Sequence, residues 1–219
     1  MISRNELAKR FCNACDCVIA AEEELTKIDA QFGDADHGFT MAKGGNAIKA
    51  AIEESDGGIQ TMLDDAAMAV MSINGGSAVP LWNTWLDGMQ EGAPEEDQTD
   101  VEGIKAIFAR AFEELDEMYG AKVGDKTMLD ALIPASEAIA AYEGDDVQAL
   151  FAAAAQAAAA GAENSKNFPS KFGRAKSYGA KTIGTPDAGA MSMSCFFRGL
   201  AKAYFQLQHS CRGGSLTLP

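Results

Sequence analysis

The sequence is poor in basic residues and in histidine. Of its 219 residues, 18 are Lys or Arg against 32 Asp or Glu, and two are His, so the formal net charge is −14. Because each phosphate contact at a nucleic-acid or anionic-membrane surface needs a Lys or Arg, this balance argues against both kinds of partner. An acidic protein can still bind phosphates where metal ions supply the positive charge.

Long hydrophobic runs and paired cysteine motifs are also missing. No stretch approaches the ~18 apolar residues that a membrane helix needs, and residues 1–6 lack the apolar run of a signal peptide. The five cysteines include one C-x-x-C pair, Cys12 and Cys15, but no second Cys or His pair completes a zinc site. These absences predict a cytoplasmic protein with reduced thiols.

The third missing pattern is that of a β-strand. No stretch of four or more residues alternates Val, Ile or Thr with polar residues, whereas apolar residues recur at helical spacing, beginning with Leu7, Phe11 and Ala14. Helices are predicted over residues 3–27, 39–54, 59–72, 78–90, 101–119, 126–142, 145–162 and 187–208. We therefore expect an all-α antiparallel bundle of about eight helices, with one domain over 1–209 and a frayed tail over 210–219.

Three aspartates lie close together after the first predicted helix: Asp29, Asp34 and Asp36, with two glycines between Asp29 and residue 39 that allow tight turns. Repulsion among the carboxylates makes such a loop costly unless a cation neutralises it, and Mg²⁺ binds carboxylates together with phosphate oxygens. The spacing lacks the frame of an EF-hand, and a helix N-cap would explain one aspartate but not three. The loop therefore predicts a site for a hard divalent cation.

Two further loops are candidates for phosphate contacts. Residues 73–78 read Ile-Asn-Gly-Gly-Ser-Ala and can present backbone N–H groups and the Ser77 hydroxyl, although a turn with an N-cap is the alternative. The loop of residues 161–187 places Arg174 and Lys181 in a glycine-rich setting that suits a nucleotide lid. The alternative for that loop is an ordinary exposed connection with solvated cations.

A fourth segment, residues 124–128, reads Gly-Asp-Lys-Thr-Met and is predicted to start a helix. Asp125 would be its N-cap, and Met128 offers a soft apolar contact for a nucleobase.

These segments together resemble the nucleotide-binding L subunit or L domain of dihydroxyacetone kinases, the DhaL family. The resemblance holds in order and approximate spacing from residue 6 to about residue 205. The segments that carry it begin at Ile28, Gly75, Pro80, Gly124, Gly173, Ile183 and Asp187.

The resemblance implies an eight-helix antiparallel barrel with a nucleotide, ATP or ADP, bound at one end. It also implies that Asp29, Asp34 and Asp36 hold two Mg²⁺ ions against the nucleotide phosphates and so carry the catalysis. The remaining residues that it implies for the nucleotide site are His37, Gly38, Phe39, Thr40, Gly76, Ser77, Ala78, Gly120, Met128, Arg174, Asp187, Ala188 and Gly189.

The implied activity is that of a kinase subunit. In this family the nucleotide phosphorylates a small ketose, such as dihydroxyacetone or erythrulose, which a histidine of a separate K subunit or domain holds covalently. The donor is either exchangeable ATP or a resident ADP that a phosphotransferase-system protein rephosphorylates, and the sequence favours neither. His37 is expected to donate a hydrogen bond to a phosphate or to be a structural residue, rather than to act as the general base.

The chain departs from the family pattern at three places. Ser77, Ala78 and Val79 follow the two glycines where the family has Ala-Ser-Gly, Asn83 replaces a glycine, and Lys181 replaces an arginine. The displaced hydroxyl motivates an alternative, a regulatory module that binds Mg-nucleotide without transferring phosphate. An all-α scaffold without a ligand would leave the three aspartates unexplained.

Overall fold

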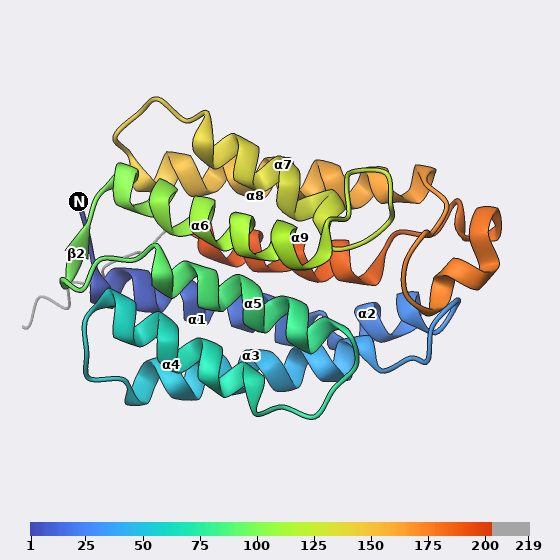
Figure 1. Cartoon of the computed structure of the whole chain (residues 1–219), viewed down its shortest axis with the longest axis horizontal. Coiled ribbons are helices and arrows are strands. Elements are labelled where there is room, and N and C mark those ends of the chain that lie inside the picture. Colours follow the sequence, from blue (N-terminus) through green and yellow to red (C-terminus); the bar gives the residue numbers. More distant parts are fainter. Residues whose placement is uncertain (203–219) are drawn as a thin grey trace, which may run out of the picture.

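The computed structural model describes residues 1–202 and is built almost entirely of helices that run along one long axis (Figure 1). The α-helices are α1 (Arg4–Ala20), α2 (Glu22–Asp29), α3 (His37–Glu54), α4 (Ile59–Met71), α5 (Ala78–Glu91), α6 (Val101–Tyr119), α7 (Leu129–Ala140), α8 (Val147–Asn164) and α9 (Ala188–Leu200). Two short 3₁₀-helices, η1 (Ser165–Asn167) and η2 (Arg174–Thr182), precede α9. The strands β1 (Ile2–Ser3) and β2 (Gln98–Thr99) pair antiparallel.

Eight of these helices form a closed ring. Contacts connect α1 to α3, then each helix from α3 to α9 to the next one along the chain, and finally α9 back to α1. The short helix α2 lies outside the ring and packs on α3 and α9. The predicted all-α barrel is therefore confirmed, with α2 as an additional element.

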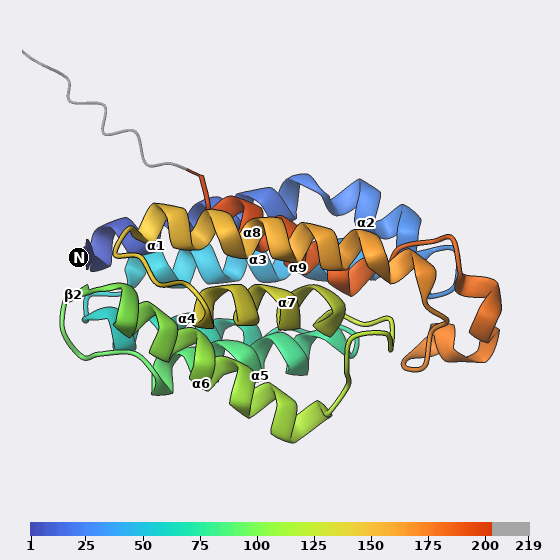
Figure 2. The ribbon, with the colours of Figure 1, turned by 90° about the horizontal axis from the view of Figure 1, so that it is seen from above.

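The antiparallel order decides where the loops lie. Neighbouring helices run in opposite directions, so every second connection falls at the same end of the barrel. Residues 30–36, 72–77, 120–128 and 165–187 meet at the right-hand end in Figure 1, opposite the N-terminus and β2. Figure 2 shows the same end from above, with η2 projecting beyond the helices.

Aromatic side chains fill the middle of the ring. Trp85, Phe108, Phe196 and Phe197 are buried, and the rings of Trp85 and Phe196 meet edge to face with centroids 5.4 Å apart. Such edge-to-face pairs add to the free energy that burial of the rings already contributes.

Small residues let neighbouring helices approach each other. A Cβ on Gly161 of α8 would lie 2.0 Å from the carbonyl oxygen of Asp130 in α7, and one on Gly199 of α9 would lie 2.3 Å from Cα of Ala14 in α1. Ala154, Ala158 and Ala162 of the Ala-rich helix α8 are likewise buried, so this helix also packs through small side chains.

Some helix ends differ from the prediction. The helix predicted over 3–27 breaks at Ala21, so α1 and α2 are separate. The helix predicted from Lys126 begins at Leu129, because Lys126 has a left-handed φ of +59°. Asp125 is not its N-cap. The Asp125 carboxylate instead accepts a hydrogen bond from the N–H of Lys122 at 2.8 Å and closes a local turn.

The loop predicted over residues 161–187 is partly helical, since α8 continues to Asn164 and η1 and η2 follow. The predicted end of the last helix at Gln208 and the predicted tail over 210–219 lie outside the described residues. Among residues 1–202, no helix combines the length and the hydrophobicity that crossing a bilayer requires.

Phe196→Ala should lower the free energy of unfolding by about 3–5 kcal/mol, because a fully buried ring is replaced by a cavity. Phe196 is 1% exposed and packs against Phe11, Trp82 and Trp85. Urea unfolding followed by circular dichroism measures the change. The control is Phe39→Ala, at a ring that is 62% exposed, which should change stability by about 0.5 kcal/mol or less.

Candidate functional site

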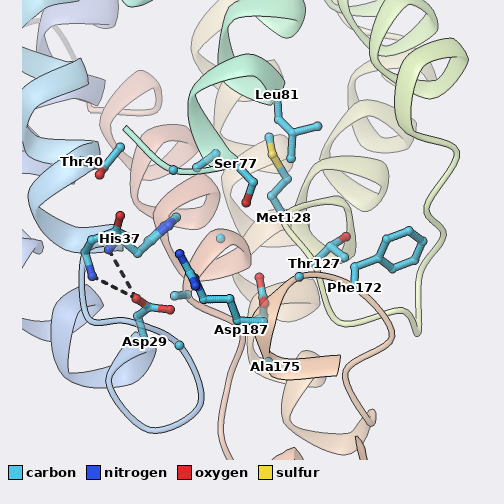
Figure 3. Close-up of a pocket in the computed structure, with 18 of the residues that line it drawn as sticks. Asp29, His37, Thr40, Ser77, Leu81, Thr127, Met128, Phe172, Ala175 and Asp187 are labelled. Carbon is cyan, nitrogen blue, oxygen red and sulfur yellow. Dashed lines mark hydrogen bonds between the residues drawn. The ribbon is translucent and has the colours of Figure 1, made fainter. Parts of the chain in front are cut away.

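The four connections at one end of the barrel enclose a cavity of about 540 Å³. Figure 3 shows Asp29, His37 and Thr40 on one side of it, with Met128 and Phe172 on the other. Every predicted site residue except Gly38, Phe39 and Gly120 lines this cavity. The further lining residues are Gly33, Leu81, Trp82, Tyr119, Lys126, Thr127, Phe172, Gly173 and Ala175.

The three aspartates converge. Asp29 ends α2, Asp34 lies in the loop, and Asp36 immediately precedes α3, yet one carboxylate oxygen from each lies within 4.8 Å of the others. The Asp29 carboxylate orders the loop by accepting hydrogen bonds from the N–H groups of Asp36 at 3.1 Å and His37 at 3.4 Å, which Figure 3 draws as dashed lines. Gly33 is required here, because a Cβ would lie 2.0 Å from Oδ1 of Asp29.

The cluster concentrates negative charge. Burial raises the pKa of Asp36, and the neighbouring Asp34 and Asp29 raise it further, while Arg174 opposes the shift. Arg174 forms an ion pair with Asp34 at 2.7 Å and so offsets one of the three charges. The Asp36 side chain makes no capping hydrogen bond to α3, so an N-cap role does not account for it. Carboxylate oxygens at this spacing are the donor set that Mg²⁺ prefers.

His37 connects α3 to α9. Its Nε2 lies 3.1 Å from the hydroxyl of Ser192, which itself donates to the carbonyl of Gly189 at 2.8 Å. Burial lowers the pKa of His37, so the ring is neutral at pH 7. The contact with Ser192 thus joins the start of α3 to α9 through the His37 ring.

The loop between α4 and α5 brings Gly76 and Ser77 to the aspartates. A Cβ on Gly76 would lie 3.4 Å from Oδ2 of Asp36, so this position is in van der Waals range of that carboxylate. Ser77 occupies the N-cap position of α5 but makes no side-chain capping bond, which leaves its hydroxyl available at the cavity.

The far wall of the cavity is apolar. The rings of Tyr119 and Phe172 lie with centroids 5.1 Å apart, and Leu81 and Met128 continue this wall. Trp82, Tyr119 and Phe172 were not among the site residues predicted from the sequence. The available signals were their positions next to selected segments, since Tyr119 precedes Gly120 and Phe172 precedes Gly173.

The three predicted residues outside the wall have other surroundings. Gly38 allows α2 and α3 to pack closely, because a Cβ there would lie 2.0 Å from the carbonyl oxygen of Glu22. Phe39 is 62% exposed, and Gly120 ends α6 in the left-handed conformation with φ of +59°.

Asp187 closes the site at the start of α9. Its carboxylate accepts a hydrogen bond from the N–H of Ala190 at 2.8 Å and caps the helix. Burial and, to a smaller extent, the nearby Asp130 raise the pKa of Asp187 to about 7, while the hydrogen bond from Ala190 and the charge of Lys126 oppose the shift. Gly189 packs tightly behind it, because a Cβ would lie 3.2 Å from the backbone nitrogen of Met128.

Asp187→Asn should remove part of the pH dependence of stability. The folded pKa of Asp187, about 7, is higher than that of an unfolded aspartate. The folded state therefore binds this proton more tightly, and the resulting stability is present at pH 4 and lost as the pH rises to 7. Asparagine keeps the capping oxygen but does not titrate, so the variant should gain stability relative to the wild type between these pH values.

Urea unfolding of both proteins at pH 4.5 and pH 8 measures this change. Asp64→Asn, on the exposed surface of α4, is the control and should leave the profile unaltered. If the stability of Asp187→Asn and that of the wild type depended equally on pH, Asp187 would not have the raised pKa given above.

Comparisons with known proteins agree with the fold. Residues 31–202 match the family model of the DAK2 domain. The chain is 35% identical over 200 residues to D-erythrulose kinase of Mycolicibacterium smegmatis, an alignment that covers 89% of this chain and 34% of the relative. It thus spans about a third of the length of that kinase.

A relative of similar length is the ADP-binding subunit DhaL of the PEP-dependent dihydroxyacetone kinase of Escherichia coli, 26% identical over 92% of this chain and 98% of the relative. Among solved structures, dihydroxyacetone kinase from C. freundii in complex with AMP-PNP and Mg²⁺ aligns with a TM-score of 0.65 and 25% identity, over 89% of this chain and 33% of that one. The chain therefore belongs to the DAK2 domain family, to which the DhaL subunits of dihydroxyacetone kinases belong.

Proposed function

We propose that this chain is the nucleotide-binding, phosphoryl-transferring L subunit of a dihydroxyacetone kinase-type enzyme. The observation that carries the proposal is the convergence of the Asp29, Asp34 and Asp36 carboxylates at one side of a cavity whose opposite wall is apolar. A nucleotide fits both walls of this cavity, since proteins bind its phosphates through divalent cations and its base through apolar surfaces.

Asp29, Asp34 and Asp36 would hold two Mg²⁺ ions. Magnesium bound there would neutralise charge on the phosphates and polarise the phosphoryl group. The donor set supports this proposal, because the loop holds like charges together and Gly33 leaves the Asp29 carboxylate uncrowded. It also resolves the apparent conflict between a net charge of −14 and a phosphate ligand.

The other cavity residues would bind and orient the nucleotide. The hydroxyls of Thr40 and Ser77 and the guanidinium of Arg174 are positioned for phosphate contacts, and Tyr119 and Met128 provide an apolar surface for the base. The Nε2 of His37 already contacts Ser192, and we assign no general base to this chain. Its contribution to catalysis would be alignment of the reacting groups, which can supply a large part of a rate enhancement.

The phosphoryl acceptor would be a small ketose carried by a separate K subunit. The erythrulose kinase relative from Mycolicibacterium smegmatis supports erythrulose, and the Escherichia coli relative supports dihydroxyacetone. The donor would be either ATP or a resident ADP rephosphorylated by a phosphotransferase-system protein. The Escherichia coli relative is named as an ADP-binding subunit of a PEP-dependent kinase, which illustrates the second route.

Asp36→Asn should weaken Mg²⁺-dependent ADP binding by at least about tenfold. Substituting a residue that only hydrogen-bonds to a metal ligand already lowers metal affinity by about that factor. Isothermal titration calorimetry with and without Mg²⁺ measures the effect. Circular dichroism should show unchanged helical content, since the substitution removes a repelling charge outside the core. The control is Asp56→Asn, at an exposed residue near the opposite end of the barrel. Wild-type affinity in Asp36→Asn would overturn the metal assignment.

Phosphoryl transfer is tested with the K subunit that co-purifies with this chain. We expect phosphorylation of dihydroxyacetone or erythrulose when the two subunits are combined with a donor. Many turnovers with ATP alone would exclude a strict requirement for the phosphotransferase system. Tight binding of Mg-ADP without transfer to either ketose, from ATP or from the phosphotransferase system, would instead support the regulatory module. The altered segment after Gly76 motivates that alternative.

A further inference from the structure

The segment of residues 166–186, which we call the closing segment, contributes no hydrophobic side chain to the buried core. Its fully buried side chains are polar, those of Ser170 and Thr182. Yet this segment supplies Phe172 and Arg174 to the cavity wall. The rings of Phe172 and Tyr178 pack against Tyr119 and Phe32, with ring centroids 5.1 and 5.2 Å apart, in the middle of the segment. Its two ends lack such ring contacts and are held by polar contacts.

The largest group of such contacts converges on one side chain. Lys126 is 4% exposed, although lysine is almost never fully buried without partners. Its Nζ lies within hydrogen-bond distance of four backbone carbonyl oxygens, those of Ser165 at 2.9 Å, Phe168 at 3.1 Å, Thr182 at 2.9 Å and Thr185 at 2.5 Å. The first two lie where the chain enters the closing segment, and the last two lie where it leaves.

These contacts use all the donors of the side chain. An ammonium group has three N–H donors, and four carbonyl acceptors already surround it. Lys126 is therefore not available as a phosphate ligand, although it lies in the wall of a cavity that suits a nucleotide. Burial lowers its pKa, while Asp187 and Asp130 favour the charged form.

The backbone around Lys126 is fixed separately. The carboxylate of Asp130, which is 0% exposed, accepts hydrogen bonds from the N–H groups of Gly124 and Thr127, both at 2.7 Å. This turn holds Lys126 at a φ of +59° and directs its side chain to the base of the closing segment. The closing segment is thus attached to the turn before α7, far from it in the sequence.

We propose that Lys126 is a positioning residue that fastens both ends of the closing segment and thereby places Phe172 and Arg174 at the nucleotide cavity. Lys126 acts on ligand affinity through these residues and does not contact the phosphates. The effect on affinity rests on the nucleotide site proposed above, whereas the fastening of the segment is a property of the free protein.

The test is Lys126→Met, which keeps an apolar stem and removes the ammonium group. Hydrogen exchange measured by mass spectrometry on the ligand-free protein should become at least about tenfold faster across residues 166–186. Losing even one hydrogen bond to a charged group shifts a local opening equilibrium by about that factor. Exchange in α4 and α5 should stay the same. The matched control is Lys171→Met, an exposed lysine of the same segment that pairs with Asp125 at 2.7 Å, and it should change little.

Calorimetry separates positioning from direct phosphate binding. If Lys126 positions the segment, Lys126→Met should weaken the binding of both Mg-ADP and adenosine, because Phe172 is displaced along with Arg174. If Lys126 instead bound the phosphates directly, Lys126→Met would weaken the binding of Mg-ADP alone and leave hydrogen exchange in the ligand-free protein unaltered. That result would overturn the proposal. If the wild type binds no Mg-nucleotide, the proposed function fails, but faster exchange in Lys126→Met would still support the fastening role.

Lys126→Gln provides a second variant if the methionine variant does not fold. Its amide keeps two donors without the charge, so faster exchange confined to residues 166–186 is again expected. Loss of helical structure throughout both variants would overturn the proposal, because Lys126 would then support the whole barrel rather than one segment.

Discussion

Closure of the helical ring is the constraint on which the rest of the structure depends. Each helix must bury its apolar face against two neighbours, and the antiparallel order brings every second connection to the same end. Four segments that are far apart in the sequence thereby share one cavity. The buried aromatic cluster around Trp85 stabilises the ring, so the polar loops can be shaped by ligand chemistry rather than by the needs of the core.

At that end the loops depend on short-range geometry. Gly33 leaves room for the Asp29 carboxylate, which a larger residue would crowd, and that carboxylate orders the turn into α3. The closing segment has no apolar core of its own and is attached through polar contacts, among them those of Lys126. The proposed nucleotide site therefore combines a tightly packed helical base with a closing segment that has no fully buried apolar side chain.

Much of the fold and of the candidate site follows from local sequence. Helical periodicity marks the helices because one face of each must be apolar, and the aspartate cluster is recognisable because its members lie within eight residues. Prediction was weaker where backbone conformation depends on distant partners. The start of α7 was misplaced because Lys126 adopts a left-handed conformation that Asp130 supports, and the break at Ala21 leaves no clear signal in the apolar pattern.

Local sequence also determines the chemistry of the three aspartates proposed as metal ligands and that of the hydroxyl next to Gly76, since the groups at each of these two places are close neighbours along the chain. Only the tertiary structure decided that Tyr119 at the end of α6 and Phe172 of the closing segment form one apolar wall. It alone also decided that the one lysine in the described cavity wall faces backbone carbonyls rather than open space. The physical reason is that these contacts join segments about fifty residues apart, and their meeting depends on ring closure rather than on any local preference.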